Sequence, residues 1–522
     1  MKPIFPTGRA FLLLLMLAVL AASPLPVFAA QPVATPEIAE QVADLAYDQW
    51  YLDSVDGQPS GYTHEWLTVL DDGTIETGYE SRRVETHGGE LMVSNSRTVW
   101  RETADLRPIS ITSENSAGTE VVRQTYTFTD DGIELLSEQA GRATTRELPA
   151  VEGDWLTPTA VELRWKVHAA AGVEAFELTT WDPEFGARPV VLSYTREDVE
   201  QVELPSGETV DATRWKVNYS VLPGIDLYEL YDGDGVMQHQ RVEFAGRVMA
   251  SVLADATVAE LEFEPPEMAQ NSTVRPDKPI DRPSRVRRAV FDLKFSEHAP
   301  EDLLPPTTMH QRAECLDDGT IRLVVDMTQE NPIAQDDTPG TDPSYMEASI
   351  MIDHTDEEVQ KLAERVRQRV GGAVDDLRFA RSARRFVTRY MTGINLATGD
   401  ATASEVARTR SGDCTECSVL LAAILRAQGI PSRCVTGLAY ADTEFAGQSD
   451  VFVYHMWTQA WIADESEQGG KWVDLDAAMF RYTATHITLG TSAMDDANAG
   501  AEMIEMVPMM NGLEIGVVEI ER

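Results

Sequence analysis

The sequence predicts an α+β protein, in which an antiparallel β-rich N-terminal region is followed by an α+β domain with helices packed on an antiparallel sheet. Two patterns lead to this fold class. Strand-like runs separated by Asp-Asp-Gly turns, as at residues 71–73 and 130–132, fill the N-terminal part. Later in the chain, helical patterns, one apolar helix and then several strand patterns follow one another within residues 349–522.

The length of 522 residues exceeds one ordinary core, since a domain has about 150 residues. Composition changes along the chain suggest where the boundaries fall, because prolines and arginines concentrate between two β-rich stretches. We expect a signal peptide at 1–29, a β-rich N-terminal region at 30–264, a linker at 265–288, a β-rich connecting segment at 289–348 and an α+β domain at 349–522.

The first residues have the pattern of a secretory signal peptide. Lys2 and Arg9 precede an apolar run at 10–22, and a Val-Phe-Ala cleavage pattern follows at 27–29. The run is shorter than the ~20 apolar residues that cross a bilayer, and no later stretch is long and apolar enough to do so. We therefore expect a periplasmic or secreted protein with no stable membrane insertion.

The composition bears on possible partners. A formal net charge of −43, spread along the chain, makes nucleic acid a poor partner and is typical of a well-solvated surface. The region at 30–264 shows no concentration of catalytic residue types. It is the candidate region for recognising a cell-envelope component.

Cys414 is the candidate nucleophile. It follows turn-prone residues at 411–413 and stands where a helix begins, and residues 418–427 of that helix are apolar nearly all round, as in a buried helix. The free N–H groups and the dipole at a helix N-terminus stabilise a thiolate, which is the reactive form of cysteine. Asp413 opposes thiolate formation if its charge lies nearby, so we expect its side chain to point away.

A cysteine nucleophile needs a base and a third group that orients the base. His455 is the candidate base, on a predicted strand at 451–463. Asp474 and Asp476 follow Trp472 on or just after another predicted strand, and either carboxylate could meet the imidazole. The residues alone therefore leave two candidates for the third group.

Four segments around these residues resemble the transglutaminase-like superfamily. They are Gly-Asp-Cys-Thr-Glu at 412–416, Arg-Ala-Gln-Gly-Ile-Pro-Ser-Arg at 426–433, His-Met-Trp-Thr-Gln-Ala-Trp-Ile at 455–462 and Trp-Val-Asp-Leu-Asp-Ala-Ala at 472–478. The resemblance covers about 349–522. The chain departs from the usual pattern at Met456, Gln459 and Cys417, none of which is a member of the proposed triad.

The resemblance implies a papain-like α+β fold and a Cys-His-Asp triad of Cys414, His455 and Asp476, with Asp476 rather than Asp474 as the acid. It also implies attack of the Cys414 thiolate on a carboxamide to give a thioester, with a backbone N–H at Cys414 in the oxyanion hole. Water would then give hydrolysis and an amine would give crosslinking. We expect a protein or peptide substrate, hydrolysis ahead of crosslinking, and no cofactor or metal.

Two other functions are compatible with the sequence. Cys414, Cys417, Cys434 and His455 could form a Cys₃His zinc module, although only the C-x-x-C half has the usual spacing. The chain could instead be a non-catalytic protein that binds a cell-envelope component. Disulfide formation by Cys417, Cys434 or Cys315 stays open. For an enzyme, we expect iodoacetamide to label Cys414 ahead of the other cysteines.

Two further patterns predict secondary structure. Arg-Trp-Lys-Val occurs at 164–167 and again at 214–217, which hints at a repeated strand unit. Near the C-terminus, strand-like runs at 503–510 and 513–520 flank Asn511-Gly512, and this dipeptide predicts a hairpin between them.

Overall fold

The computed structural model describes residues 42, 45–87, 90–117, 120–139, 141–186, 188–244, 246–268, 273–295, 304–331, 338–371, 374–392, 401–443, 448–465, 469–479, 481–496 and 507–522. The chain forms two compact units. The N-terminal unit consists of Leu13–Thr86 and Leu91–Glu267, and the C-terminal unit consists mainly of Met268–Arg522. The predicted signal peptide at 1–29 lies outside the described residues.

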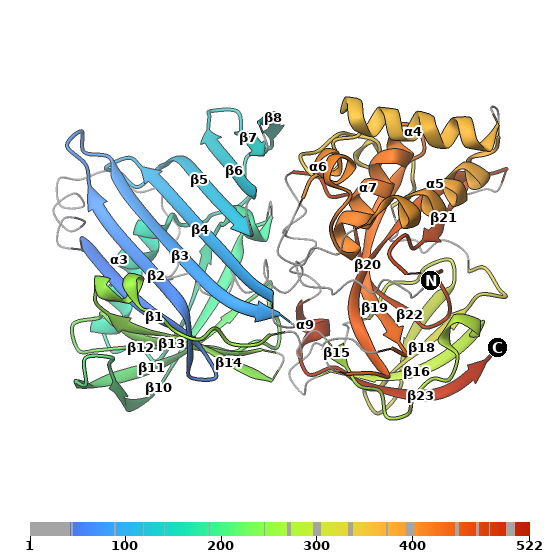
Figure 1. Ribbon diagram of the computed structural model, residues 1–522. Coiled ribbons are helices and arrows are strands. Elements are labelled where there is room, and N and C mark those ends of the chain that lie inside the picture. Colours follow the sequence, from blue (N-terminus) through green and yellow to red (C-terminus); the bar gives the residue numbers. More distant parts are fainter. Residues whose placement is uncertain are drawn as a thin grey trace. The chain divides into compact units, whose positions relative to one another are not determined.

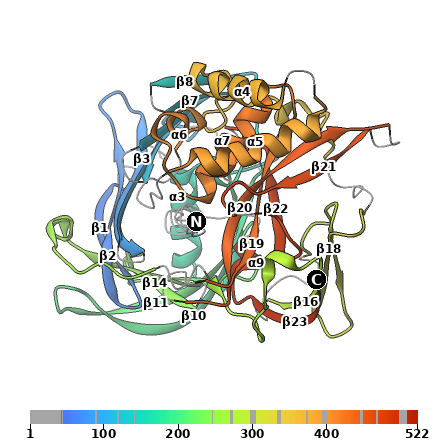
Figure 2. The same ribbon diagram turned by 45° about the vertical axis from the view of Figure 1, so that its right-hand side comes forward.

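The N-terminal unit is built on one antiparallel sheet that curves around helix α3 (Pro158–Ala170) (Figures 1 and 2). Its strands run in the order β8-β7-β6-β5-β4-β3-β2-β1-β14-β13-β12-β11-β10-β9. Their bounds are β1 (Tyr47–Val55), β2 (Gln58–Val69), β3 (Ile75–His87), β4 (Glu90–Glu102), β5 (Pro108–Ala117), β6 (Glu120–Phe128), β7 (Ile133–Gln139), β8 (Arg142–Leu148), β9 (Ala175–Thr180), β10 (Val190–Glu203), β11 (Thr209–Tyr219), β12 (Leu227–Tyr231), β13 (Met237–Phe244) and β14 (Arg247–Ala254).

The Asp-Gly turns join neighbouring antiparallel strands, as the sequence predicts. At 71–73 the turn connects β2 to β3, with Gly73 at φ +83° and the Thr74 N–H donating to Asp72 Oδ1 at 2.9 Å. The turn at 130–132 connects β6 to β7. These hairpins depend on local turn chemistry, which is why the sequence contains enough information to place them.

The predicted Arg-Trp-Lys-Val repeat is wrong. Residues 214–217 lie in β11, but 164–167 lie in helix α3. Pro158 occupies the first turn of α3, where its missing N–H costs nothing. Glu102 also accepts hydrogen bonds from Thr157 and Thr159 at the start of this helix. These helix-start contacts outweigh the strand preference of four residues.

The C-terminal unit contains two antiparallel sheets and a layer of helices (Figure 1). One sheet contains β15 (Thr273–Val274), β20 (Val451–Ala463), β19 (Ser432–Ala441) and β22 (His486–Ser492), with β21 (Gly470–Leu475) paired to β20. The other contains β17 (Gln311–Cys315), β18 (Ile321–Asp326), β16 (Arg288–Lys294) and β23 (Glu514–Glu521). The α-helices are α4 (Glu357–Val370), α5 (Asp376–Tyr390), α6 (Ala403–Thr409), α7 (Cys414–Arg426) and α9 (Val507–Met510).

The expected linker and connecting segment are joined to the C-terminal unit. Within 265–288, β15 pairs with β20, and the Ile280 N–H donates to the Tyr440 hydroxyl at 2.8 Å. Within 289–348, β16 and β18 pair with each other, and β16 also pairs with the C-terminal strand β23. Strands within 289–348 therefore belong to a sheet that the end of the chain completes.

The predicted C-terminal hairpin is wrong. The strand that follows Gly512, β23, pairs with β16, and Val507–Met510 forms the short helix α9. Pro508 cannot donate to a sheet ladder, which weakens the strand alternative. Residues 501–506 lie outside the described part of the chain.

Helix α7 is the central helix of the α layer. All of its residues are buried, and it contacts β19, β20 and each of α4, α5 and α6. At its C-terminal end the Arg426 guanidinium donates to the carbonyl oxygens of Glu347, Ser432 and Ala493 at 2.7 to 2.8 Å. None of the helices among the described residues is long and apolar enough to span a bilayer.

Candidate active site

Cys414 is the first residue of α7, as the sequence predicts, and its side chain is 1 % exposed. The Sγ atom accepts a hydrogen bond from the backbone N–H of Met456 on β20. A second contact, from Thr458 Oγ1 to the Ser418 carbonyl oxygen at 3.0 Å, joins the same helix and strand. The thiol therefore lies against the strand segment that carries His455.

Asp413 caps α7 instead of pointing away from it. Its Oδ1 accepts from the Thr415 N–H at 2.8 Å, and Glu416 Oε2 accepts from the Asp413 N–H at 2.7 Å, which makes a capping box. Burial, and then the Asp413 charge, raise the pKa of Cys414 well above its ordinary value, while the Met456 N–H acts in the opposite direction. Burial and the Asp413 charge therefore favour the neutral thiol over the thiolate at Cys414.

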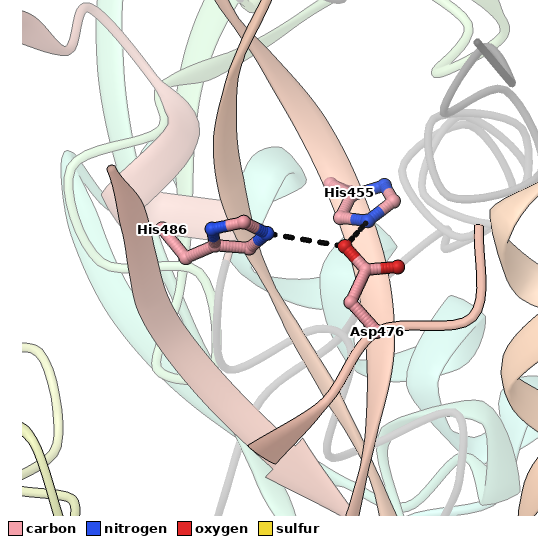
Figure 3. Close-up of side chains that lie close together, drawn as sticks. All are labelled: His455, Asp476 and His486. Atoms are coloured by element: carbon pink, nitrogen blue, oxygen red, sulfur yellow. Dashed lines mark hydrogen bonds and ion pairs between the residues drawn. The ribbon is translucent and has the colours of Figure 1, made fainter. Parts of the chain in front are cut away.

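His455 lies on β20 and is 2 % exposed. Its Nε2 atom is 3.0 Å from Asp476 Oδ2 (Figure 3). A carboxylate only accepts hydrogen bonds, so Nε2 carries a proton and Nδ1 is the ring atom left to exchange one. This Nδ1 atom is buried and has no hydrogen-bond partner among the described residues. The ring is thus held in the tautomer that a general base for Cys414 requires.

Asp476 follows the end of β21 and is fully enclosed. The backbone N–H groups of Ala478 and Met479 donate to its Oδ1 at 2.9 and 2.8 Å. Burial alone would raise the pKa of Asp476, but the charges and hydrogen bonds of His455 and His486 bring this pKa well below the usual range. The carboxylate stays ionised while it orients the imidazole.

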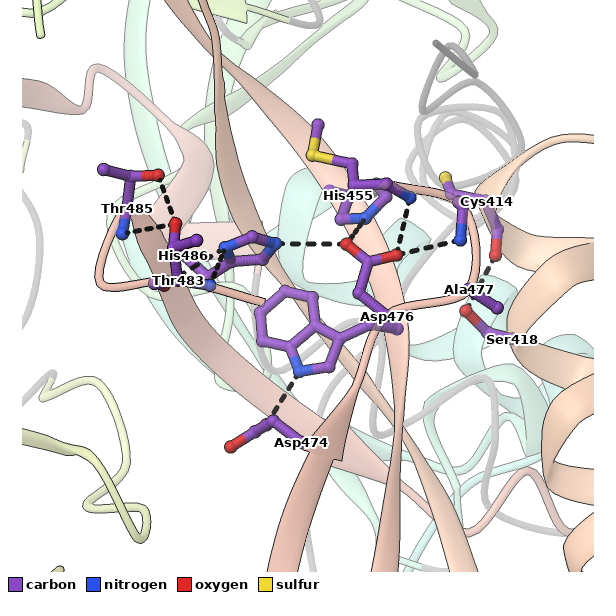
Figure 4. Close-up of polar contacts among 12 residues, drawn as sticks. Cys414, Ser418, His455, Asp474, Asp476, Ala477, Thr483, Thr485 and His486 are labelled. Atoms are coloured by element: carbon purple, nitrogen blue, oxygen red, sulfur yellow. Dashed lines mark hydrogen bonds and ion pairs between the residues drawn. The ribbon is translucent and has the colours of Figure 1, made fainter. Parts of the chain in front are cut away.

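His486 is the site residue that the sequence analysis missed. It begins β22, and its Nε2 lies 3.1 Å from the same Asp476 Oδ2 that meets His455. In the view of Figure 4, His486 lies on one side of the Asp476 carboxylate, with His455 and Cys414 on the other. His486 Nδ1 lies 3.3 Å from the Thr483 nitrogen and 3.2 Å from the Thr483 carbonyl oxygen, so the ring has polar contacts at both of its nitrogens. Asp476 is therefore held by two imidazoles.

Gly437 on β19 explains how β22 comes close enough. It pairs with His455 on one side and with Thr488 on the other. A Cβ at this position would lie 2.0 Å from the Ile487 carbonyl oxygen and 2.9 Å from the Trp457 ring. Only glycine allows the three strands to approach in this way, and the approach brings His486 to Asp476.

Asp474, the other candidate acid, has different partners. Its Oδ1 accepts from Trp457 Nε1 and Gln459 Nε2, both at 2.8 Å. Burial raises the pKa of Asp474. The described contacts thus pair His455 with Asp476 and give Asp474 a structural role between two side chains of β20.

Metal binding has one geometric candidate among the described residues. One ligand atom each from His455, Asp476 and His486 lies within 4.8 Å of the others, and two imidazoles with one carboxylate suit several divalent transition metals. Such an ion would replace both hydrogen bonds to Asp476 Oδ2 and would bind the atoms that orient the base. Metal binding and triad chemistry are therefore alternatives at this site.

The Cys₃His zinc site does not form. Among the described residues, no metal-ligand group includes Cys414, Cys417 or Cys434 together with His455. All four cysteines are free thiols, with Cys315 exposed and the other three buried. Cys417 and Cys434 are packing residues of α7 and β19.

Residues 361–477 match the model of the transglutaminase-like superfamily. The matched segment runs from α4 to the residue after Asp476 and includes Cys414 and His455. The chain therefore contains a transglutaminase-like domain, as the motifs predict, and its helices on an antiparallel sheet have the α+β architecture of that superfamily.

Three solved structures have partial likeness to the chain. A beta-barrel-like protein of domain of unknown function DUF1849 from Brucella abortus has 13% identity and a TM-score of 0.31, with 40% of this chain and 96% of that one covered. A candidate cysteine protease from Cytophaga hutchinsonii has 15% identity and a TM-score of 0.26, with 45% and 86% covered. A candidate protease from Parabacteroides distasonis has 9% identity and a TM-score of 0.18, with 76% and 70% covered. No curated protein matches the chain.

Proposed function

We propose that the C-terminal unit is a thiol enzyme that acts on amide or peptide bonds through a thioester, with Cys414 as nucleophile, His455 as base and Asp476 as the orienting acid. The proposal depends most on the hydrogen-bond partners of the two ring nitrogens of His455. Its Nε2 is engaged by Asp476, its buried Nδ1 has no partner among the described residues, and the next residue donates its N–H to Cys414 Sγ.

The chemistry follows from these positions. The Cys414 proton passes to His455 Nδ1, and the thiolate attacks the carbonyl carbon of the substrate amide to give a tetrahedral oxyanion. When this intermediate collapses, the C–N bond breaks and the leaving amine takes the proton from His455 Nδ1–H. The remaining acyl group is a thioester on Sγ. Asp476 keeps its negative charge throughout and stabilises the imidazolium.

The burial of the thiol sets a condition on this reaction. Cys414 is 1 % exposed, so a substrate carbonyl reaches Sγ only after neighbouring groups move. Because burial and the Asp413 charge favour the neutral thiol, proton transfer to His455 belongs to the reaction with bound substrate. We therefore expect a low reactivity of Cys414 in the free protein.

The proposal also covers the acyl acceptor, which we take to be water, and the location of the enzyme, which we take to be outside the cytoplasm. We place hydrolysis ahead of amine transfer, by analogy with the superfamily, and a protein or peptide as substrate. The N-terminal pattern of Lys2, Arg9 and the apolar run at 10–22 supports export, so the enzyme would act in the periplasm or outside the cell.

The test compares the wild type with Cys414→Ala on a mixed protein substrate, with and without a labelled primary amine, and reads the products by mass spectrometry. Cleaved products without amine label support hydrolysis, and incorporated label indicates transfer. Cys417→Ala is the matched control, because it removes a buried thiol one turn along α7 and should leave activity in place. Equal product formation by Cys414→Ala and the wild type would rule out the proposal.

A further inference from the structure

The N-terminal unit contains a partly open cavity of about 80 Å³. Its walls come from α3, from β1 to β4 and from β9 to β11. Seven strands separate β4 from β10 in the sheet order, so the curvature of the sheet around α3 brings distant strands to one space (Figure 2). A cavity of this size has room for several water molecules or for one small organic group.

The lining of this cavity is aromatic and acidic. Glu65, Glu162 and Asp182 contribute carboxyl groups, and no Lys, Arg or His is among the described residues that line it. The aromatic residues of the lining are Tyr47, Tyr79, Trp100, Trp181, Phe185 and Tyr219. Aromatic faces attract cations through the negative charge of the ring surface, and carboxylates attract them directly.

Glu65 is the most unusual of these side chains. On β2 the inward face carries Thr63, Glu65 and Leu67, and this face normally holds apolar residues. Glu65 is 9 % exposed, and its carboxyl group has no hydrogen bond or ion pair with any described residue. A buried carboxyl group without a partner costs free energy, so its presence facing a cavity calls for a ligand that provides one.

Other buried acids of this unit have their partners within the protein. Asp53 accepts from Thr63 at 2.8 Å and from Ser251 at 2.6 Å, and Glu229 accepts from Tyr231 at 2.8 Å. Glu162 on α3 has one cation near it, Lys166 Nζ at 3.7 Å, beyond hydrogen-bond length. Glu65 therefore has the fewest close partners of these acids, and Glu162 comes next.

We propose that this cavity binds an organic cation, an ammonium compound whose charge lies between Glu65 and Glu162 and whose carbon groups contact the aromatic lining. The aromatic walls favour an organic ammonium group over a metal ion, which needs several oxygen ligands. The site is distinct from the cysteine site and does not depend on the proposed thiol chemistry.

Binding of a cation in this place is linked to protons. Burial, and then the carboxyl groups of Glu229, Glu162 and Asp53, together raise the pKa of Glu65 to about 8, while Tyr47 and Tyr51 face it as neutral phenols. Near pH 6 the free protein therefore holds Glu65 protonated. A bound cation favours the ionised form, so binding releases a proton and tightens as the pH rises toward 8.

The experiment measures binding of tetramethylammonium and of 1,5-diaminopentane to the full-length protein by calorimetry at pH 6 and pH 8, with 1,5-pentanediol as the uncharged comparison. Tetramethylammonium cannot accept an acyl group, so its binding is independent of catalysis. The variants are Glu65→Gln and Glu162→Gln, with Glu134→Gln as the control, since Glu134 is an exposed carboxylate on β7. Thermal melts verify that each variant is folded.

We expect saturable binding of at least one of the two cations, a tighter affinity at pH 8 than at pH 6, and weak or no binding of pentanediol. Glu65→Gln should lower the affinity by about tenfold to a hundredfold, as expected for loss of a charge-assisted contact, and Glu134→Gln should leave it unchanged. The proposal is overturned if the wild type binds neither cation, if pentanediol binds as well as the diamine, or if folded Glu65→Gln and Glu162→Gln both keep the wild-type affinity.

Discussion

At the scale of single residues, the centre of the C-terminal site is one carboxylate oxygen shared by two histidines. Asp476 Oδ2 accepts from His455 at 3.0 Å and from His486 at 3.1 Å, and its other oxygen accepts two backbone N–H groups. These four contacts fix the carboxylate on all sides. The polar contacts of His486 are with Asp476 and Thr483, so its expected role is to position Asp476.

Removing the second imidazole should therefore weaken catalysis without abolishing it. His486→Gln should lower kcat by about tenfold or more, as is typical when an orienting contact is lost, with a smaller effect on KM. It should also change the pH profile of kcat, because His486 helps to lower the pKa of Asp476. His310→Gln is the control, since His310 bonds to the Asp326 and Gln329 carbonyl oxygens. A His486→Gln profile identical to the wild type would contradict the positioning role.

Thiol reactivity gives a second test at this scale. The sequence alone suggests that Cys414 reacts first with iodoacetamide, whereas the burial of this thiol leads us to expect the opposite order. Cys315 is exposed, whereas Cys414 is buried with a raised pKa. Peptide mapping over time should find Cys315 alkylated first, with little loss of activity, and Cys315→Ser should behave like the wild type. Alkylation of Cys414 ahead of Cys315 in the free protein would contradict the closed, neutral thiol.

At the scale of elements, the N-terminus of α7 must satisfy the free N–H groups of the helix and also hold the Cys414 thiol. The Asp413 and Glu416 capping box satisfies the first N–H groups of the helix, but it also places carboxylates next to Cys414. Both residues raise the pKa of the thiol. The helix start is thus stabilised at the expense of the thiolate.

Asparagine at position 413 separates these effects, because it caps a helix about as well as aspartate and carries no charge. In Asp413→Asn the pKa of Cys414 should fall, since the second-largest cause that raises it is gone. The acidic limb of the kcat/KM profile should therefore move to lower pH, while the melting temperature changes little. A limb that stays in place or moves to higher pH would show that the Asp413 charge does not act on the thiol.

Local signals account for what the sequence predicts at this scale. The helix start at Cys414 follows from turn residues and an apolar run, and the Asp-Gly turns place the hairpins of the N-terminal sheet. His486 could not be found in this way, because only the pairing of β19 with β22 brings it to Asp476. On one strand, Asp474 and Asp476 would point to the same face, so the sequence could not distinguish them. In the structure β21 ends at Leu475, and Asp476 lies beyond the strand.

At the scale of the whole molecule, buried acids make stability depend on pH. Burial raises the pKa of Glu65 and of Glu229 to about 8 and that of Glu102 to about 7, against about 4.3 in an unfolded chain. Between these values the folded N-terminal unit holds protons that the unfolded chain releases. The contribution of these groups to the free energy of unfolding is therefore greatest below about pH 4.3. It decreases as the pH rises through 7 and 8.

We expect the urea concentration at the unfolding midpoint of the N-terminal unit to decrease as the pH is raised from 5 to 8.5. Hydrogen exchange of peptides from β1 to β14 measures this midpoint. Asp476 acts in the opposite sense, because its pKa is lowered, but its contribution is lost only below about pH 4. Glu229→Gln should reduce the slope, and Glu134→Gln should not. A midpoint that is constant or rises over this range would show that these carboxyl groups are not held protonated.

The most direct test of the central claim is to look for the acyl-enzyme on Cys414. The wild type is mixed with a peptide substrate and quenched in acid within the first turnover, and its peptides are mapped by mass spectrometry. We expect an acyl group on Cys414 that hydroxylamine removes, and no such group in Cys414→Ala. Substrate turnover by the Cys414→Ala variant, or an acyl group on a different residue, would contradict this expectation.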